Sequence, residues 1–164
     1  MAGFFFKKKK DADIVANNFQ CLRPEDIRVG LPVMDKYDAI RLAGRMLVER
    51  GSVEEPYVEA MIQRENTVST YLGDGVAIPH GIGEAKKYIK STGLVVLQFS
   101  GDGVDFGAGN VKLLVGIAGL HEEHIPILQA VAKIIMNQEL LEELQQTSDP
   151  NFIHRILTTG GDNQ

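Results

Sequence analysis

Two spacings of apolar residues alternate along the first half of the chain and predict both strands and helices. The short alternating run 27–31 predicts a strand. After Asp35, a typical N-cap residue, apolar residues recur three and four positions apart, which predicts a helix that ends at Gly51. Pro56 is typical of a first helical turn, so a second helix is expected there, ending near residues 65–68.

The middle of the chain has the pattern of a buried sheet. Residues 70–83 are rich in glycine and in residues that favour strands, and predict two short strands followed by a tight loop that opens at Pro79. The runs 93–100 and 111–118 are almost continuously apolar, which is typical of strands covered on both faces. The sequence therefore predicts an α/β fold, a three-layer sandwich in which a mixed β-sheet is flanked by helices on both faces.

The last third of the chain is predicted to be helical. From His121 onward, apolar residues recur at helical spacing, which predicts a helix over 121–136. Glu122 and Glu123 are expected in its first turn, where negative charge suits the helix dipole. Shorter helices are expected near 138–146 and 149–157.

The two ends of the chain lack a clear period. Residues 1–24 are expected to form a flexible tail and an irregular lead-in, and residues 159–164 a C-terminal tail, which leaves one domain over 25–158. The first ten residues place three phenylalanines before four lysines, the reverse of the order in a signal peptide. The lysines leave open a weak contact with a membrane surface.

Composition and charge exclude several classes of protein. The chain has 164 residues, of which 44% are apolar and 24% charged, as expected for one globular domain. Its formal net charge is −5, and without the lysines at 7–10 it is −9, because 13 basic residues then face 22 acidic ones. A folded domain with this negative net charge is not expected to bind nucleic acid without sequence preference. Cys21 stands alone, so no internal disulfide can form and a cytoplasmic location is expected.

His80 is the first candidate for chemistry. It follows the apolar strand residues 76–78 and lies between Pro79 and Gly81, so an exposed imidazole is expected at the end of a buried strand. Active sites of α/β folds tend to lie at such strand ends. An ordinary surface-loop histidine is the alternative that this local context leaves open.

Several segments in the same order as in a known family extend this candidate. The segments are Arg64-Glu65, Ser69–Gly73, Val76–Gly81, Ala85-Lys86, Gly103–Gly107, Val115–Ala118, Glu123–Ile125 and Ile127-Leu128. Together they resemble the IIA proteins of the bacterial phosphoenolpyruvate-dependent sugar phosphotransferase system, in its mannitol/fructose class. The resemblance covers roughly residues 25–158.

The resemblance implies a phosphoryl relay. It implies that the phosphocarrier protein HPr phosphorylates His80 on Nε2, and that the group then passes to a cysteine of a IIB partner, which serves the membrane component IIC. Neutral imidazole suits this task, because it is a nucleophile near pH 7 and forms a labile P–N bond. The relay implies no metal and no organic cofactor, and the chain has neither a P-loop nor a Gly-x-Gly-x-x-Gly segment that opens a helix.

Two further residues match the family pattern at the phosphate. His124 is expected near the N-terminus of a helix, where an uncharged imidazole can donate an N–H to phosphate. Arg64 is expected at the end of the second helix, and its guanidinium suits phosphate oxygens. A solvated helix-end histidine and a structural ion pair are the respective alternatives.

The other two histidines are expected to have lesser roles. His121 is three positions before His124, so the pair could share a metal on one helix face, but no third ligand is evident. His154 is expected to be structural. At the level of function, two alternatives to the sugar relay stay open: a nitrogen-related regulatory IIA protein that signals by its phosphorylation state, and a binding module that has lost transfer.

Overall fold

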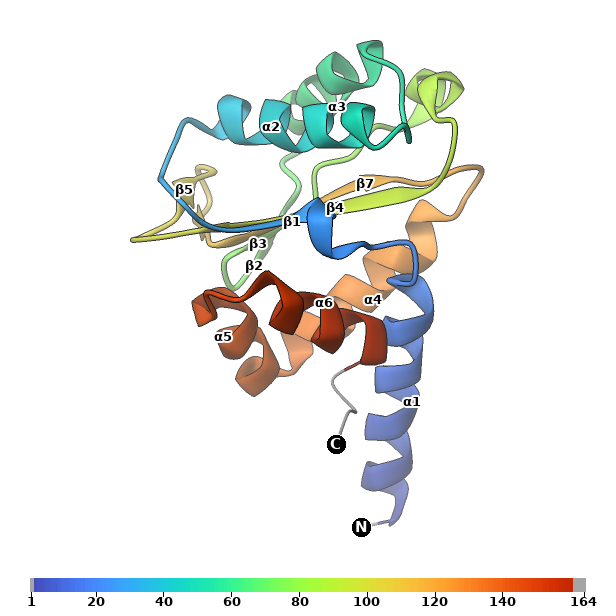
Figure 1. Ribbon diagram of the computed structural model, residues 1–164, viewed down its shortest axis with the longest axis vertical. Helices are drawn as coiled ribbons and strands as arrows, with labels where there is room; N and C mark the ends of the chain where they lie inside the picture. The colour runs from blue at the N-terminus through green and yellow to red at the C-terminus, as the bar shows by residue number, and fades with distance from the viewer. Residues whose placement is uncertain (1, 161–164) are drawn as a thin grey trace.

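The computed structural model describes residues 2–160 and confirms the predicted three-layer α/β fold (Figure 1). The main strands are β1 (Ile27–Leu31), β2 (Tyr71–Gly73), β3 (Val76–Ala77), β4 (Gly93–Phe99) and β7 (Leu113–Ala118). Their order in the sheet is β1-β4-β7-β3-β2. β1 pairs with β4 and β3 with β7 in parallel, whereas β4 with β7 and β2 with β3 are antiparallel, so the sheet is mixed. A separate hairpin is formed by β5 (Val104–Asp105) and β6 (Asn110–Val111).

Helices cover both faces of this sheet. The α-helices are α1 (Ala2–Asn18), α2 (Lys36–Glu49), α3 (Pro56–Thr67), α4 (His124–Met136), α5 (Gln138–Gln146) and α6 (Pro150–Thr159), and the 3-10 helices are η1 (Pro24–Asp26) and η2 (Gly83–Tyr88). In Figure 1, α2 and α3 lie on one face of the sheet, and α1, α4, α5 and α6 lie on the other. The predicted start of α2 is confirmed, because the Asp35 carboxylate accepts a hydrogen bond from the amide of Tyr37.

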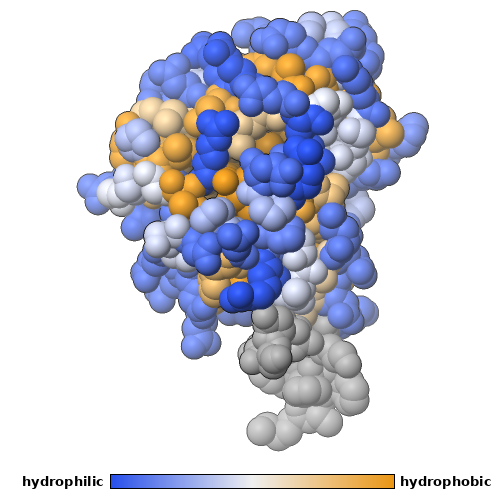
Figure 2. Space-filling view, in the orientation of Figure 1, coloured by the Kyte–Doolittle hydropathy of each residue, from blue (hydrophilic) through white to orange (hydrophobic). Residues whose placement is uncertain are grey.

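The two central strands are buried on both faces, as their apolar sequences predict. Every residue of β4 and β7 is buried. Because side chains alternate along a strand, Leu94 and Val96 pack into the core beneath α1, α4, α5 and α6, whereas Val95 and Leu97 pack beneath α2 and α3. The outer surface in this orientation is largely hydrophilic with apolar patches between (Figure 2), as is normal for a folded domain.

The predicted irregular lead-in is wrong, because α1 occupies most of it. Val15 of α1 is almost fully buried, as are Phe19 and Leu22, which follow the end of the helix at Asn18 and pack in the same hydrophobic core. Asp11 forms an ion pair with Lys133 of α4 at 3.3 Å. The predicted boundary at residue 25 thus divides segments that pack together.

The C-terminal end also differs slightly from the prediction. α6 continues to Thr159 and ends at Gly160, whose φ of +68° is the left-handed conformation of a helix C-cap. The remaining part of the predicted tail, residues 161–164, lies outside the described residues. The predicted structural role of His154 agrees with its place here, because its Nε2 lies 3.1 Å from the carbonyl oxygen of Leu22.

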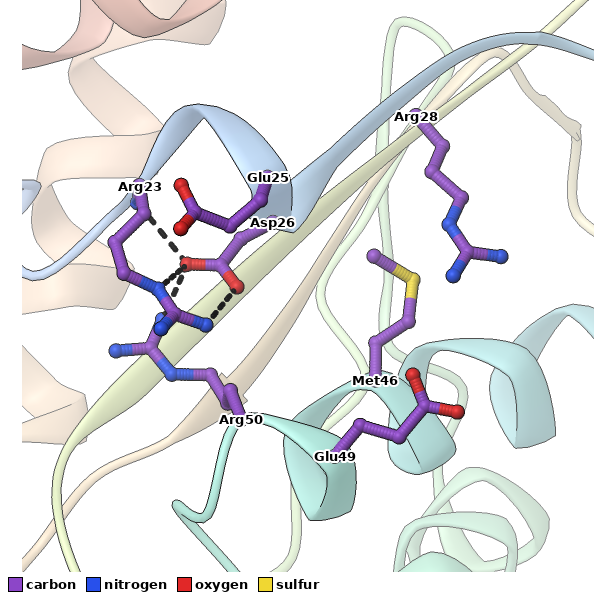
Figure 3. Close-up of a pocket in the computed structure, with 7 residues that line it drawn as sticks. All are labelled: Arg23, Glu25, Asp26, Arg28, Met46, Glu49 and Arg50. Carbon is purple, nitrogen blue, oxygen red and sulfur yellow. Dashed lines mark hydrogen bonds and ion pairs between the residues drawn. The ribbon is translucent and has the colours of Figure 1, made fainter.

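A polar cavity of about 250 Å³ lies where η1 meets the end of α2 (Figure 3). At its centre the buried Asp26 carboxylate binds Arg23 and Arg50, each at 2.7 Å. Arg50 also donates to the carbonyl of Cys21, and burial raises the pKa of that thiol above its ordinary value. This cluster is therefore structural. The cavity is lined by Arg23, Glu25, Asp26, Arg28, Met46, Glu49 and Arg50, and so by none of the predicted site residues.

Candidate active site

His80 lies at the carboxyl end of β3, beside the carboxyl end of β7. The chain continues from β3 in parallel with β7, so the amide of Ile117 donates to the carbonyl of Pro79 at 3.0 Å and His80 lies opposite Ile117. The position at the strand ends agrees with the prediction. The ring is more enclosed than predicted, because His80 is only 4% exposed.

The imidazole of His80 is held in one tautomer. Its Nδ1 lies 2.7 Å from the carbonyl oxygen of Ile78, and because a carbonyl can only accept, Nδ1 carries the hydrogen. Burial lowers the pKa of His80 below its ordinary value of 6.5. The Ile78 hydrogen bond opposes this effect, and the electrostatic influence of Arg64, with a smaller one from His124, adds to it. The ring is therefore neutral near pH 7, and the lone pair is on Nε2.

The structure brings His124 to His80. The two ring centroids are 6.0 Å apart and the ring planes are inclined by 30°. The Nδ1 atom of His124 is buried and has no hydrogen-bond partner among residues 2–160. The ring beside His80 therefore has one nitrogen that no described residue engages.

The turn before His124 corrects one prediction. The helix expected from His121 begins only at His124, because His121 has a φ of +59°, which a right-handed helix does not allow. Glu122 and Glu123 consequently lie in the turn, where Glu122 binds Lys86 at 2.7 Å and Glu123 binds the hydroxyl of Thr92. His121 and His124 do not share one helix face, so the argument for a shared metal site fails.

Gly119 permits this turn to lie close to His124, and no pattern in the sequence singles this glycine out. A Cβ atom at position 119 would lie 2.3 Å from the backbone nitrogen of His124 and 2.6 Å from its Cβ. Any larger residue at this position must displace His124. Thr92 supports the same turn, because its hydroxyl accepts the amide of Leu120 at 3.0 Å.

Arg64 lies in the last turn of α3, as predicted, with its guanidinium near enough to His80 to affect its charge. Its Nη1 donates to the carbonyl of Val68, and its Nε is buried with no partner among the described residues. The alternative role of Arg64, a structural ion pair, is not seen among the described residues. The adjacent acid, Glu65, instead forms an ion pair with Lys36 at 3.6 Å. Arg64 thus has an N–H without a partner among the described residues, and its positive charge is felt at His80.

We expect His80 to titrate below pH 6.5. Its lowered pKa means that the unfolded chain binds the proton more readily, so the ring stays neutral in the folded protein as the pH falls through 6.5. Stability contributed by this group is present above pH 6.5 and is lost as the pH falls toward the lowered pKa. An NMR titration of the ring carbons measures the midpoint, with His80→Gln assigning the signal. A midpoint at or above 6.5 would contradict the burial argument.

Comparison with known proteins identifies the family. Residues 20–160 match the family model described as phosphoenolpyruvate-dependent sugar phosphotransferase system, EIIA 2. The chain belongs to this family. It is accordingly a phosphotransferase component, as the resemblance of its motifs predicts.

Individual EIIA 2 relatives and structures agree with this assignment. The mannitol-specific phosphotransferase enzyme IIA component of Geobacillus stearothermophilus is 44% identical over 83% of this chain and 94% of its own length. A mannitol-specific EIICBA component of Vibrio cholerae is 40% identical over 84% of this chain, which corresponds to only 22% of that longer protein. The Escherichia coli complex of enzyme IIAMTL and phosphorylated enzyme IIBMTL has a chain with a TM-score of 0.75 and 34% identity, over 81% of this chain and 94% of that one. Within residues 2–160, no helix is long and apolar enough to cross a membrane.

Proposed function

We propose that this EIIA 2 protein carries a phosphoryl group on His80, accepting it from phosphorylated HPr and passing it to a cysteine of a mannitol-type IIB partner. The observation that carries the proposal is the neutral, enclosed His80, whose Nε2 lone pair is free while Nδ1 is bound to Ile78. The mannitol-specific relatives and the IIA–IIB complex support the choice of partner. The membrane component IIC is then the indirect partner, and the cytoplasm is the compartment.

Transfer needs little more than alignment and charge stabilisation. In the first step Nε2 of His80 forms a bond to phosphorus as the donor P–N bond breaks, and the electron pair of that bond stays with the donor imidazole. Arg64 then supplies positive charge to the phosphoryl oxygens, and the unpaired nitrogen of His124 supplies a donor. In the second step the His80–phosphorus bond breaks as the IIB thiolate attacks. These residues require no metal or organic cofactor for either step.

The surface around His80 suits transient docking of both partners. Ile82 and Ile125 are 48% and 44% exposed and lie close in the chain to His80 and His124. Val68 is 63% exposed, and its own carbonyl accepts the hydrogen bond from Arg64. Exposed apolar residues near a reactive group are typical of a protein contact site. The predicted domain, residues 25–158, contains all of them.

Onward transfer tests the mannitol assignment. The protein is first labelled with phosphoenolpyruvate, enzyme I and HPr, purified, and mixed with a mannitol-specific IIB domain. We expect the label to appear on IIB and to leave the protein at the same rate. A variant IIB whose acceptor cysteine is replaced by serine is the control. Labelling without onward transfer would favour the regulatory alternative, and no labelling at all would favour a binding module.

A further inference from the structure

Tyr57 connects α3 to the loop that carries His80. It lies in the first turn of α3, directly after Pro56, and is 0% exposed. Its hydroxyl donates to the carbonyl of Ile117 at 2.8 Å and accepts the amide of Gly81, also at 2.8 Å. One buried hydroxyl thus joins the peptide directly after His80 to the strand beside it.

The ring of Tyr57 also fixes the space beside Gly81. A Cβ atom at position 81 would lie 2.8 Å from Cε2 of Tyr57, so the loop packs against the ring as closely as only glycine permits. Burial raises the pKa of Tyr57 to about 12, so the hydroxyl keeps its proton at neutral pH and remains the donor to Ile117. The hydroxyl therefore has a fixed donor and a fixed acceptor role.

Three contacts hold the backbone on both sides of His80. The carbonyl of Pro79 is bound by the amide of Ile117, the carbonyl of Ile78 by Nδ1 of His80, and the amide of Gly81 by Tyr57. The first two lie before His80 in the chain, and only the third lies after it. Without the Tyr57 hydroxyl, the amide of Gly81 and the carbonyl of Ile117 would lose this shared partner inside the protein, and the loop could relax outward.

We infer that Tyr57 is a positioning residue for phosphoryl transfer, which holds the peptide after His80 so that Nε2 faces the incoming phosphorus with Nδ1 still bound to Ile78. This inference rests on the proposed role of His80. Tyr57 touches neither the partner surface nor the reacting atoms. Its effect is therefore on the rate of the transfer step and not on the affinity for the donor.

The Tyr57→Phe variant tests the inference, because it removes the hydroxyl and keeps the packed ring. We expect the maximal rate of phosphoryl uptake from phosphorylated HPr to fall about tenfold with KM unchanged, since small displacements of a reacting group cost rate. In the same variant, the ¹⁵N shifts of His80 should show a loss of the Nδ1–H tautomer. Tyr37→Phe is the matched control: it also removes a tyrosine hydroxyl, one that donates to Asn66 on the surface, and should leave both readouts unchanged.

The outcomes separate this inference from the proposed function. All variants are assayed well below their measured unfolding temperatures, so that global stability does not enter the rates. A wild-type rate and a wild-type tautomer in Tyr57→Phe would overturn the positioning role, whereas uptake of label by His80→Gln would overturn the function on which it rests. A lower rate with an unchanged His80 tautomer would also contradict the inference. The hydroxyl would then affect the rate by a route that does not involve the position of His80.

Discussion

Replacing His80 with glutamine is expected to abolish phosphoryl uptake. Glutamine approximates the size of the ring and can still donate to the carbonyl of Ile78, but its amide nitrogen has no lone pair with which to attack phosphorus. With phosphoenolpyruvate, enzyme I and HPr in excess, the wild-type protein should take up about one label per chain and His80→Gln none above background. Acid-labile, base-stable label followed over time measures the difference.

The control for this experiment is the exposed histidine in the neighbouring turn. His121→Asn removes an imidazole close to the site, and asparagine tolerates the left-handed backbone at this position. It should be labelled at the wild-type rate. If His80→Gln accepted label as the wild type does, the acceptor would be another residue and the proposed site would be wrong.

Replacing His124 with alanine is expected to slow phosphoryl uptake about a hundredfold and leave the protein folded. Loss of one donor aimed at developing charge typically costs that much in rate. The ring of His124 is partly exposed and its Nδ1 has no partner among the described residues, so its removal breaks no hydrogen bond of the fold. Single-turnover labelling measures the rate, and thermal unfolding measures the stability.

Two further variants separate the loss of the N–H donor from a displacement of His124. His124→Gln keeps an N–H donor and should recover part of the lost rate. Gly119→Ala keeps the imidazole but forces its backbone to move, and should slow uptake as well. Equal rates in the wild type and His124→Ala would remove His124 from the site.

Much of the fold follows from local patterns in the sequence. The buried central strands have continuous apolar runs, and the helices after Asp35 and Pro56 begin at residues whose side chains favour helix starts. The predictions fail where tertiary contacts decide. α1 is stable because it packs against α4 and α6, with Val15 in the same core as Phe19 and Leu22 of the segment that follows the helix. The late start of α4 depends on the backbone of His121.

The residues of the candidate site likewise divide into those that the sequence predicts and those that only the tertiary structure reveals. His80, Arg64 and His124 could be singled out from residue types and family resemblance, and the structure places them together around one imidazole. Tyr57 and Gly119 could not, because their roles depend on distances across the fold. In the sequence, Tyr57 lies at the start of the predicted second helix and belongs to none of the segments that resemble the family. The enclosure of His80 is likewise a result of packing, since its neighbours in the sequence predict an open ring.

The position of the phosphate on the labelled protein decides whether Nε2 of His80 is the acceptor. The protein, enriched in ¹⁵N, is phosphorylated through enzyme I and HPr, and the histidine side-chain nitrogens are observed by NMR before and after labelling. We expect a phosphorus–nitrogen coupling at Nε2 of His80, with Nδ1 still protonated and bound to Ile78. Phosphate on Nδ1 of His80, or on any of the other three histidines, would contradict it.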